Sequence, residues 1–98
     1  MAKVGFCAVS GSGMSALAQI SKYIGNDVYG SDRSFDQGKD QHNKLALENV
    51  GIKIFPQDGS MLDSDFDVLY ASTAVEDTIP DIKKARELNI RLSRRFPT

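Results

Sequence analysis

The sequence contains one cysteine, one histidine and no tryptophan among its 98 residues. A single cysteine has no partner within the chain, so Cys7 excludes an internal disulfide. Cys7 lies in an apolar run, and we expect it to be buried as a small hydrophobic residue. His42 lies in a polar stretch, so the sequence offers neither a thiol–imidazole pair nor a cluster of metal ligands. The carboxylates form no clear acid–base pair either. We therefore predict no catalytic residue and no metal site in this chain.

The chain also lacks an excess of charge and any long hydrophobic run. Its 12 basic and 13 acidic side chains give a formal net charge of −1. This argues against a nucleic-acid partner, which requires a concentrated positive field. No apolar stretch approaches the ~20 residues that a membrane-spanning helix needs. The N-terminal residues lead directly into a strand-like run, not an export signal, so we expect a cytoplasmic protein without a membrane partner.

Short apolar runs alternate with segments of helical periodicity. The runs cover residues 4–9, 28–31, 52–55, 68–72 and 90–92. Helical patterns lie between most of them, at 14–24, 40–49 and 80–89, whereas 56–66 has no apolar period and is expected to be a loop. Alternation of strands and helices predicts an α/β domain of three layers, with a five-stranded parallel sheet in the order 3-2-1-4-5. We expect one domain, spanning residues 1–98.

The spacing of apolar residues also predicts the buried helix faces. In the first helix the apolar face runs from Met14 to Ile24, and Gly25 ends the helix. Leu47 and Val50 are expected to line the inner face of the second helix. Pro80 suits the first turn of the third.

The most informative motif is the Gly/Ser-rich turn between the first strand and the first helix, Ser10-Gly11-Ser12-Gly13-Met14-Ser15. Small residues let a phosphate approach the backbone, and the free N–H groups at a helix N-terminus attract it. As a dinucleotide fingerprint the turn fits poorly, because Ala8 and Ser10 stand where the first two glycines belong. The turn therefore predicts a nucleotide ligand. The alternative is that its small residues serve only the close packing of the strand on the helix.

The ends of two further strands supply polar residues. Ser31 and Asp32 follow the second strand, and Asp32 lies 19 residues beyond Gly13, the spacing of an acidic residue that accepts hydrogen bonds from a nucleoside. The alternative for Asp32 is a capping role, and Arg33 either covers the site or faces water. Beyond the fourth strand, Ser72, Thr73 and Ala74 either line a nucleotide pocket or satisfy backbone groups of the loop. The basic residues near the C-terminus are expected to be solvated.

These stretches resemble the Mur ligases. Residues 6–18, FCAVSGSGMSALA, resemble the family's N-terminal signature G-I-G-G-x-G-M-S-G-L-A, and in particular that of the members that join L-alanine to UDP-N-acetylmuramate. Residues 30–32 (GSD), 51–54 (GIKI) and 72–75 (STAV) agree with family stretches in order and spacing. Ala8 and Ser10 depart from the family's glycines, and residues 55–59 contain no histidine where the family often has a Gly-His pair. These departures leave open a sister ligase that recycles a murein tripeptide.

The resemblance implies a Rossmann-like domain that holds the UDP part of UDP-N-acetylmuramate in peptidoglycan synthesis. The diphosphate would lie at residues 10–15, the uridine at Ser31 and Asp32, and residues 72–74 would form the other wall. In the family, ATP and Mg²⁺ bind a central domain that carries the P-loop, and a C-terminal domain receives the amino acid. No G-x-x-x-x-G-K-[ST] motif occurs in this sequence. We therefore expect a substrate-binding fragment of a longer ligase, with no cofactor of its own and no activity alone.

Two other functions fit the same pattern. An NAD-binding domain of a dehydrogenase or regulatory protein would explain the alternating strands and helices and Asp32, but it explains Ser10 and the Gly-Met-Ser turn less well. A structural or interaction domain without a small ligand is the other alternative.

Overall fold

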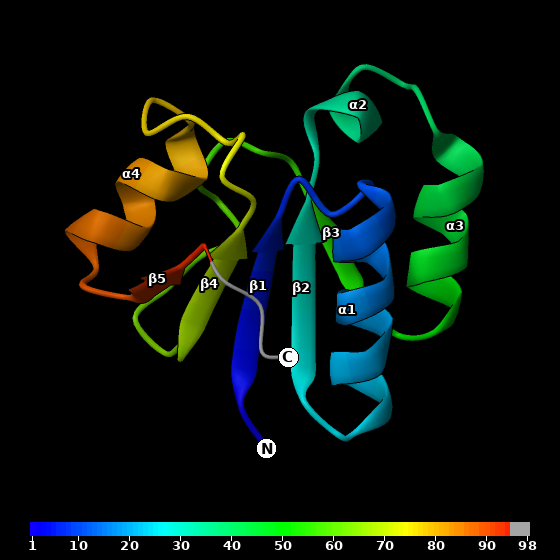
Figure 1. The fold of residues 1–98 in the computed structure, drawn as a ribbon, viewed down its shortest axis with the longest axis horizontal. Helices are drawn as coiled ribbons and strands as arrows, with labels where there is room; N and C mark the ends of the chain where they lie inside the picture. Colours follow the sequence, from blue (N-terminus) through cyan, green and yellow to red (C-terminus); the bar gives the residue numbers. More distant parts are fainter. Residues whose placement is uncertain (95–98) are drawn as a thin grey trace.

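The computed structural model describes residues 1–94, which form five strands and four helices. All five strands are parallel, in the order β3-β2-β1-β4-β5, as the sequence predicts (Figure 1). Within these residues no helix is both long and apolar enough to cross a membrane. In chain order the elements are β1 (Lys3–Cys7), α1 (Ser12–Tyr23), β2 (Asp27–Ser31), α2 (Arg33–Asp36), α3 (Gln41–Asn49), β3 (Lys53–Phe55), β4 (Val68–Ala71), α4 (Pro80–Glu87) and β5 (Arg91–Ser93).

The sheet separates two apolar clusters because successive side chains of a strand point to opposite faces. Val4 and Phe6 of β1 pack with Met14 and Ala18 of α1 and with Leu47 of α3. Cys7 of the same strand packs on the other face, with Leu69 of β4 and with Ile82 and Ala85 of α4. Figure 1 shows α1 and α3 together on one side of the sheet and α4 on the other. The domain is therefore the predicted three-layer α/β fold.

The loop between β3 and β4 completes the second cluster. Residues 56–66 contain turns and no regular helix, as expected. Met61, Leu62 and Phe66 are nevertheless buried, and they pack in the cluster of Ile82 and Ala85. This loop therefore covers the part of the sheet that α4 leaves open.

The element boundaries differ from the predictions in places that have simple causes. Strand β1 ends at Cys7 instead of Val9 because Ala8 adopts a left-handed conformation, with φ 65°. Helix α1 ends at Tyr23, and Gly25 follows with φ 102°. Ile24 lies beyond the last turn and is 69% exposed, so its predicted place on the buried face is wrong. The same holds for Val50, which is 46% exposed after the end of α3. The sequence analysis also missed the short helix α2.

Candidate functional site

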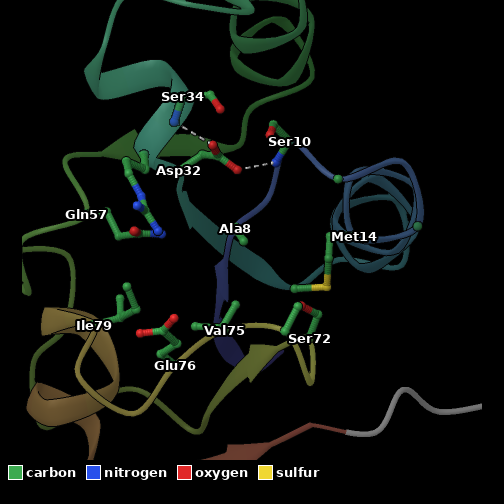
Figure 2. Close-up of a pocket in the computed structure, with 14 residues that line it drawn as sticks. Ala8, Ser10, Met14, Asp32, Ser34, Gln57, Ser72, Val75, Glu76 and Ile79 are labelled. Atoms are coloured by element: carbon green, nitrogen blue, oxygen red, sulfur yellow. Dashed lines mark hydrogen bonds between the residues drawn. The ribbon is translucent and has the colours of Figure 1, made fainter.

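A cleft of about 640 Å³ opens at the carboxyl ends of the strands. It lies where the strand order reverses, between β1 and β4, which is where open parallel sheets bind ligands. Its volume is within the range of small-molecule sites. Figure 2 shows the walls that face one another across the opening: the turn with Ser10 and Met14, and the loop with Ser72, Val75 and Glu76.

The first wall is the turn between β1 and α1, which supplies Ala8, Ser10, Gly11, Gly13 and Met14 to the cleft. Two of its backbone N–H groups have partners within the fold. The N–H of Ser10 donates to Oδ2 of Asp32 at 2.9 Å, and that of Gly11 donates to the carbonyl of Ala8 at 3.3 Å. The N–H groups of Gly13 and Met14, in the first turn of α1, have no hydrogen-bond partner among residues 1–94. An anion in the cleft therefore has two free amides within the turn, and Ser10 and Gly11 offer none.

Gly13 leaves room at this wall. A Cβ built at Gly13 would meet no heavy atom within 4 Å, and the residue lines the cleft. A Cβ at Gly11 would lie 3.6 Å from the carbonyl oxygen of Ala8, which is ordinary van der Waals contact. Open space beside free amides is what a close backbone approach by a phosphate requires.

Asp32 ties the turn to the end of β2. Its side chain is 5% exposed, and both carboxylate oxygens accept backbone hydrogen bonds (Figure 2). Oδ2 accepts from Ser10, and Oδ1 accepts from the N–H of Ser34 at 2.8 Å, which makes Asp32 the N-cap of α2. The capping role that the sequence left open is therefore present. A carboxylate has about four acceptor positions, so a nucleoside contact would use those that remain.

Ser31 lies away from the cleft. Its side chain is fully buried, and its hydroxyl donates to Oδ2 of Asp81 in the first turn of α4. The other oxygen of Asp81 accepts from the N–H of Gly59 at 2.8 Å. Burial raises the pKa of the Asp81 carboxyl, although both hydrogen bonds act in the opposite direction. The Ser31 hydroxyl therefore has a structural contact, which joins β2 to α4 and to the loop after β3, and the residue does not line the cleft.

Two other residues predicted for the turn occupy different places. Ser15 is 8% exposed within α1 and accepts a hydrogen bond from Gln19 instead of lining the cleft. Ser12 begins α1, and its side chain lies outside the described part of the structure. Among the residues predicted for this wall, the cleft is therefore lined by Ser10, Gly11, Gly13 and Met14.

The loop between β4 and α4 forms the second wall. It contributes Ser72, Ala74, Val75, Glu76 and Ile79. Of the three residues predicted here, Ser72 and Ala74 line the cleft, whereas Thr73 is exposed and does not. The N–H of Val75 donates to the carbonyl of Ser72 at 3.1 Å and closes a turn at the start of the loop.

The sequence analysis missed several residues of the cleft. Ser34 lies close to Asp32, and Gln57 reaches the cleft from the loop after β3. Arg33, for which the sequence left open a place over the site or in water, also lines the cleft. Gln57 falls in the stretch that departs from the family's Gly-His pair, so a signal for it existed. Gln57 also donates from Nε2 to the sulfur of Cys7 at 3.4 Å. Glu76 and Ile79 carry no sequence signal beyond their position after a strand.

The chemistry of the cleft suits binding. Among the described residues that line it, Arg33 is the one basic side chain, and Glu76 and Asp32 are the acidic ones. Burial raises the pKa of the Cys7 thiol to about 12, so this cysteine stays protonated and unreactive near neutral pH. Within residues 1–94 no three His, Cys, Asp or Glu side chains lie close enough to hold a metal ion.

Comparisons with known proteins point to one family. A family model described as "Mur ligase family, catalytic domain" matches residues 3–96. A protein of Francisella philomiragia named UDP-N-acetylmuramate–L-alanine ligase is 37% identical over 95 residues, which cover 95% of this chain and 20% of that protein. A protein of the same name from Mesorhizobium japonicum is 34% identical over 92 residues, covering 94% of this chain and 19% of that protein. The chain therefore spans about a fifth of the length of the curated relatives it matches.

Solved structures agree with the fold. The structure of a UDP-N-acetylmuramate–alanine ligase from Thermotoga maritima superposes with a TM-score of 0.81 at 32% identity, over 94% of this chain and 20% of that one. A murein peptide ligase from Psychrobacter arcticus superposes with a TM-score of 0.75 at 18% identity, over 95% of this chain and 19% of that one. At that identity the second likeness concerns the fold alone.

Proposed function

The chain belongs to the Mur ligase family, and we propose that its cleft binds the UDP part of UDP-N-acetylmuramate within an ATP-dependent ligase that adds L-alanine in peptidoglycan synthesis. One observation carries this proposal. The N–H groups of Gly13 and Met14, at the N-terminus of α1, have no hydrogen-bond partner in the described part of the chain, and they lie on a cleft at the point where the strand order reverses. Free amides and the helix dipole favour a phosphate at this position.

In this proposal each wall has its own task. The diphosphate lies against Gly13 and Met14, and Arg33 adds a positive charge from the end of β2. The nucleoside lies toward Asp32 and the second wall, where Ser72 supplies a hydroxyl and Ala74 leaves space. The shape of the turn is held by the hydrogen bond from Ser10 to Asp32 and by the one from Gly11 to Ala8. Thr73, Ser12, Ser15 and Ser31 have no assigned contact in this arrangement.

We place the reaction itself outside these 98 residues. ATP supplies the energy that activates the muramyl carboxylate, and the family binds it with a P-loop that this sequence does not contain. The residues present therefore do not fit ATP and Mg²⁺, and we propose that residues 1–98 are one substrate-binding domain of a longer cytoplasmic enzyme with central and C-terminal domains. Such a domain contributes by positioning the substrate, because binding of the nucleotide far from the reaction holds the reacting carboxylate in the correct place.

The L-alanine ligases are preferred over the tripeptide-recycling ligases because relatives with the former name reach 37% and 34% identity. The murein peptide ligase of Psychrobacter arcticus supports the fold alone. The match to the Mur ligase family also supports a UDP-sugar as the ligand over NAD.

Calorimetric titration of the chain with UDP-N-acetylmuramate, UDP, uridine and NAD tests the proposal. We expect the first two to bind, uridine to bind more weakly because it lacks the diphosphate, and NAD not to bind at the same concentrations. Equal affinities for uridine and UDP would show that the cleft does not bind the diphosphate. Binding of NAD alone would contradict the proposed function.

A further inference from the structure

Arg94, directly after β5, reaches the wall of the cleft that lies between β4 and α4. Its Nη1 donates to the carbonyl of Ser72 at 2.8 Å and to that of Val75 at 2.7 Å. Its Nη2 donates to Oδ1 of Asp77 at 2.9 Å. One guanidinium therefore holds three acceptors of a single loop, although it lies 17 to 22 residues further along the chain.

The register of the sheet explains this contact. Ser93 of β5 pairs with Tyr70 of β4, so the residue after β5 arrives beside the start of the loop that follows β4. Arg94 is only 27% exposed, and its guanidinium satisfies two carbonyl groups of the loop. The sequence analysis expected it to be solvated with its basic neighbours, and that expectation is wrong.

The loop has few backbone hydrogen bonds of its own, although Val75 and Ile79 pack against the apolar cluster of Ile82 and Ala85. The turn from Ser72 to Val75 has one backbone hydrogen bond of its own, and the turn from Glu76 to Ile79 has another. Ser72 and Val75, whose carbonyls Arg94 takes, are also residues that line the cleft. Figure 2 shows their side chains at the edge of the opening, opposite Met14.

We propose that Arg94 is a positioning residue that holds this loop in the shape needed to receive the ligand. The inference rests on the proposed function, because it assigns the loop to the binding of the nucleotide. Arg94 touches no ligand in this account, and it acts through the backbone of Ser72 and Val75. Lysine would not replace it, because an ammonium group lacks the planar fork of donors that reaches two carbonyls and a carboxylate together.

Arg86 provides a matched control. Its Nη2 contacts the same oxygen of Asp77 at 3.2 Å, but no hydrogen bond joins it to the carbonyls of Ser72 or Val75. It is also more exposed, at 60%. Arg86→Ala therefore removes the same charge and a bond to the same carboxylate, and leaves the contacts to the loop backbone intact.

The test measures loop and ligand separately in the 98-residue chain. Amide hydrogen exchange at Val75 and Ile79, the two loop amides that donate to loop carbonyls, is followed by NMR without ligand and reports the state of the loop, and titration with UDP gives the Kd. For Arg94→Ala we expect loop exchange to accelerate about tenfold or more, with no change in β1 and β2. We expect the Kd for UDP to rise about fivefold or more, whereas Arg86→Ala leaves both within about twofold.

Arg94→Lys should behave like Arg94→Ala, and it serves as the second variant should the alanine substitution unfold the chain. Guanidinium at millimolar concentration should restore part of the affinity of Arg94→Ala, which a purely structural loss would not allow. Loop exchange or UDP affinity equal to that of Arg86→Ala would overturn the inference. If the wild-type chain bound no UDP at all, the proposed function would fail and the inference with it. If wild type and Arg94→Ala bound UDP equally well, the inference alone would be overturned.

Discussion

The carboxylate of Asp32 accepts a 2.9 Å hydrogen bond from the backbone N–H of Ser10, which lies 22 residues earlier in the chain. The same carboxylate caps α2 through Ser34. A single side chain thus joins the turn after β1 to the end of β2, and these two segments make adjoining parts of the cleft. The turn is held from within the fold, which leaves its amides at Gly13 and Met14 for a ligand.

Replacement of Asp32 by alanine should destabilise the protein. The variant loses an N-cap and leaves the Ser10 N–H without its partner, which together cost about 1–3 kcal/mol. Urea unfolding should show a lower midpoint with an unchanged slope. Asp65→Ala is the control, because Asp65 is exposed and should change the free energy of unfolding by less than about 0.5 kcal/mol. Equal midpoints for the two variants would show that the Asp32 contacts contribute nothing.

Ala8→Gly should stabilise the protein. Ala8 adopts φ 65°, where a Cβ is unfavourable and glycine is not. We expect a gain of about 0.5–1 kcal/mol in the free energy of unfolding. Ala16→Gly, at an exposed position inside α1, should lose about 0.5–1 kcal/mol for the opposite reason. A loss of stability in both variants would mean that the Ala8 side chain contributes more by packing than its backbone conformation costs.

Gly13→Leu should block the ligand and spare the fold. The position lines the cleft and has open space where a Cβ would lie, so the leucine side chain has room but takes up the volume beside the free amides. Affinity for UDP should fall about tenfold or more, while the free energy of unfolding changes by less than about 1 kcal/mol. Ala16→Leu, one turn further along the exposed face of α1, should bind normally. Unchanged affinity in Gly13→Leu would place the phosphate elsewhere.

The buried carboxyl of Asp81 gives a prediction for pH. Burial raises its pKa in the folded protein above 3.8, so folding favours the neutral form. The stability that this form contributes is present below the pKa of the unfolded chain and is lost as the pH rises through the folded value. Asp81→Asn stays neutral, so its stability relative to wild type should increase between pH 3.5 and 7.5. Urea unfolding across this range measures the difference, and a constant difference would contradict the prediction.

The strand order was predictable because each crossover between parallel strands is right-handed and each apolar run is bounded by turn residues. It was harder to predict which face of the sheet each single side chain lies on. Val28 of β2 packs with α1 and α3, and Tyr29 packs on the α4 face, so the two-residue repeat of a strand already places Ser31 on the side of Asp81. A stricter use of that repeat at the strand end would have removed Ser31 from the predicted site.

Other features depend on contacts between distant segments, which local patterns do not reveal. The role of Arg94 follows from the pairing of β5 with β4. In the sequence alone, Arg94 cannot be told apart from the other basic residues near the C-terminus. The capping of α2 by Asp32 was one of two roles compatible with its spacing, and only the position of Ser34 shows that the capping role is present. Ile24 has the helical spacing of a buried residue, but α1 ends before it.

The central claim is that the first turn of α1 receives the diphosphate of UDP, and amide chemical shifts test it most directly. In a titration of the ¹⁵N-labelled chain with UDP, the largest changes should occur at the N–H groups of Gly13 and Met14. Uridine should leave these two signals nearly unmoved. Changes that gather elsewhere, or equal changes with uridine and UDP at Gly13 and Met14, would contradict the account.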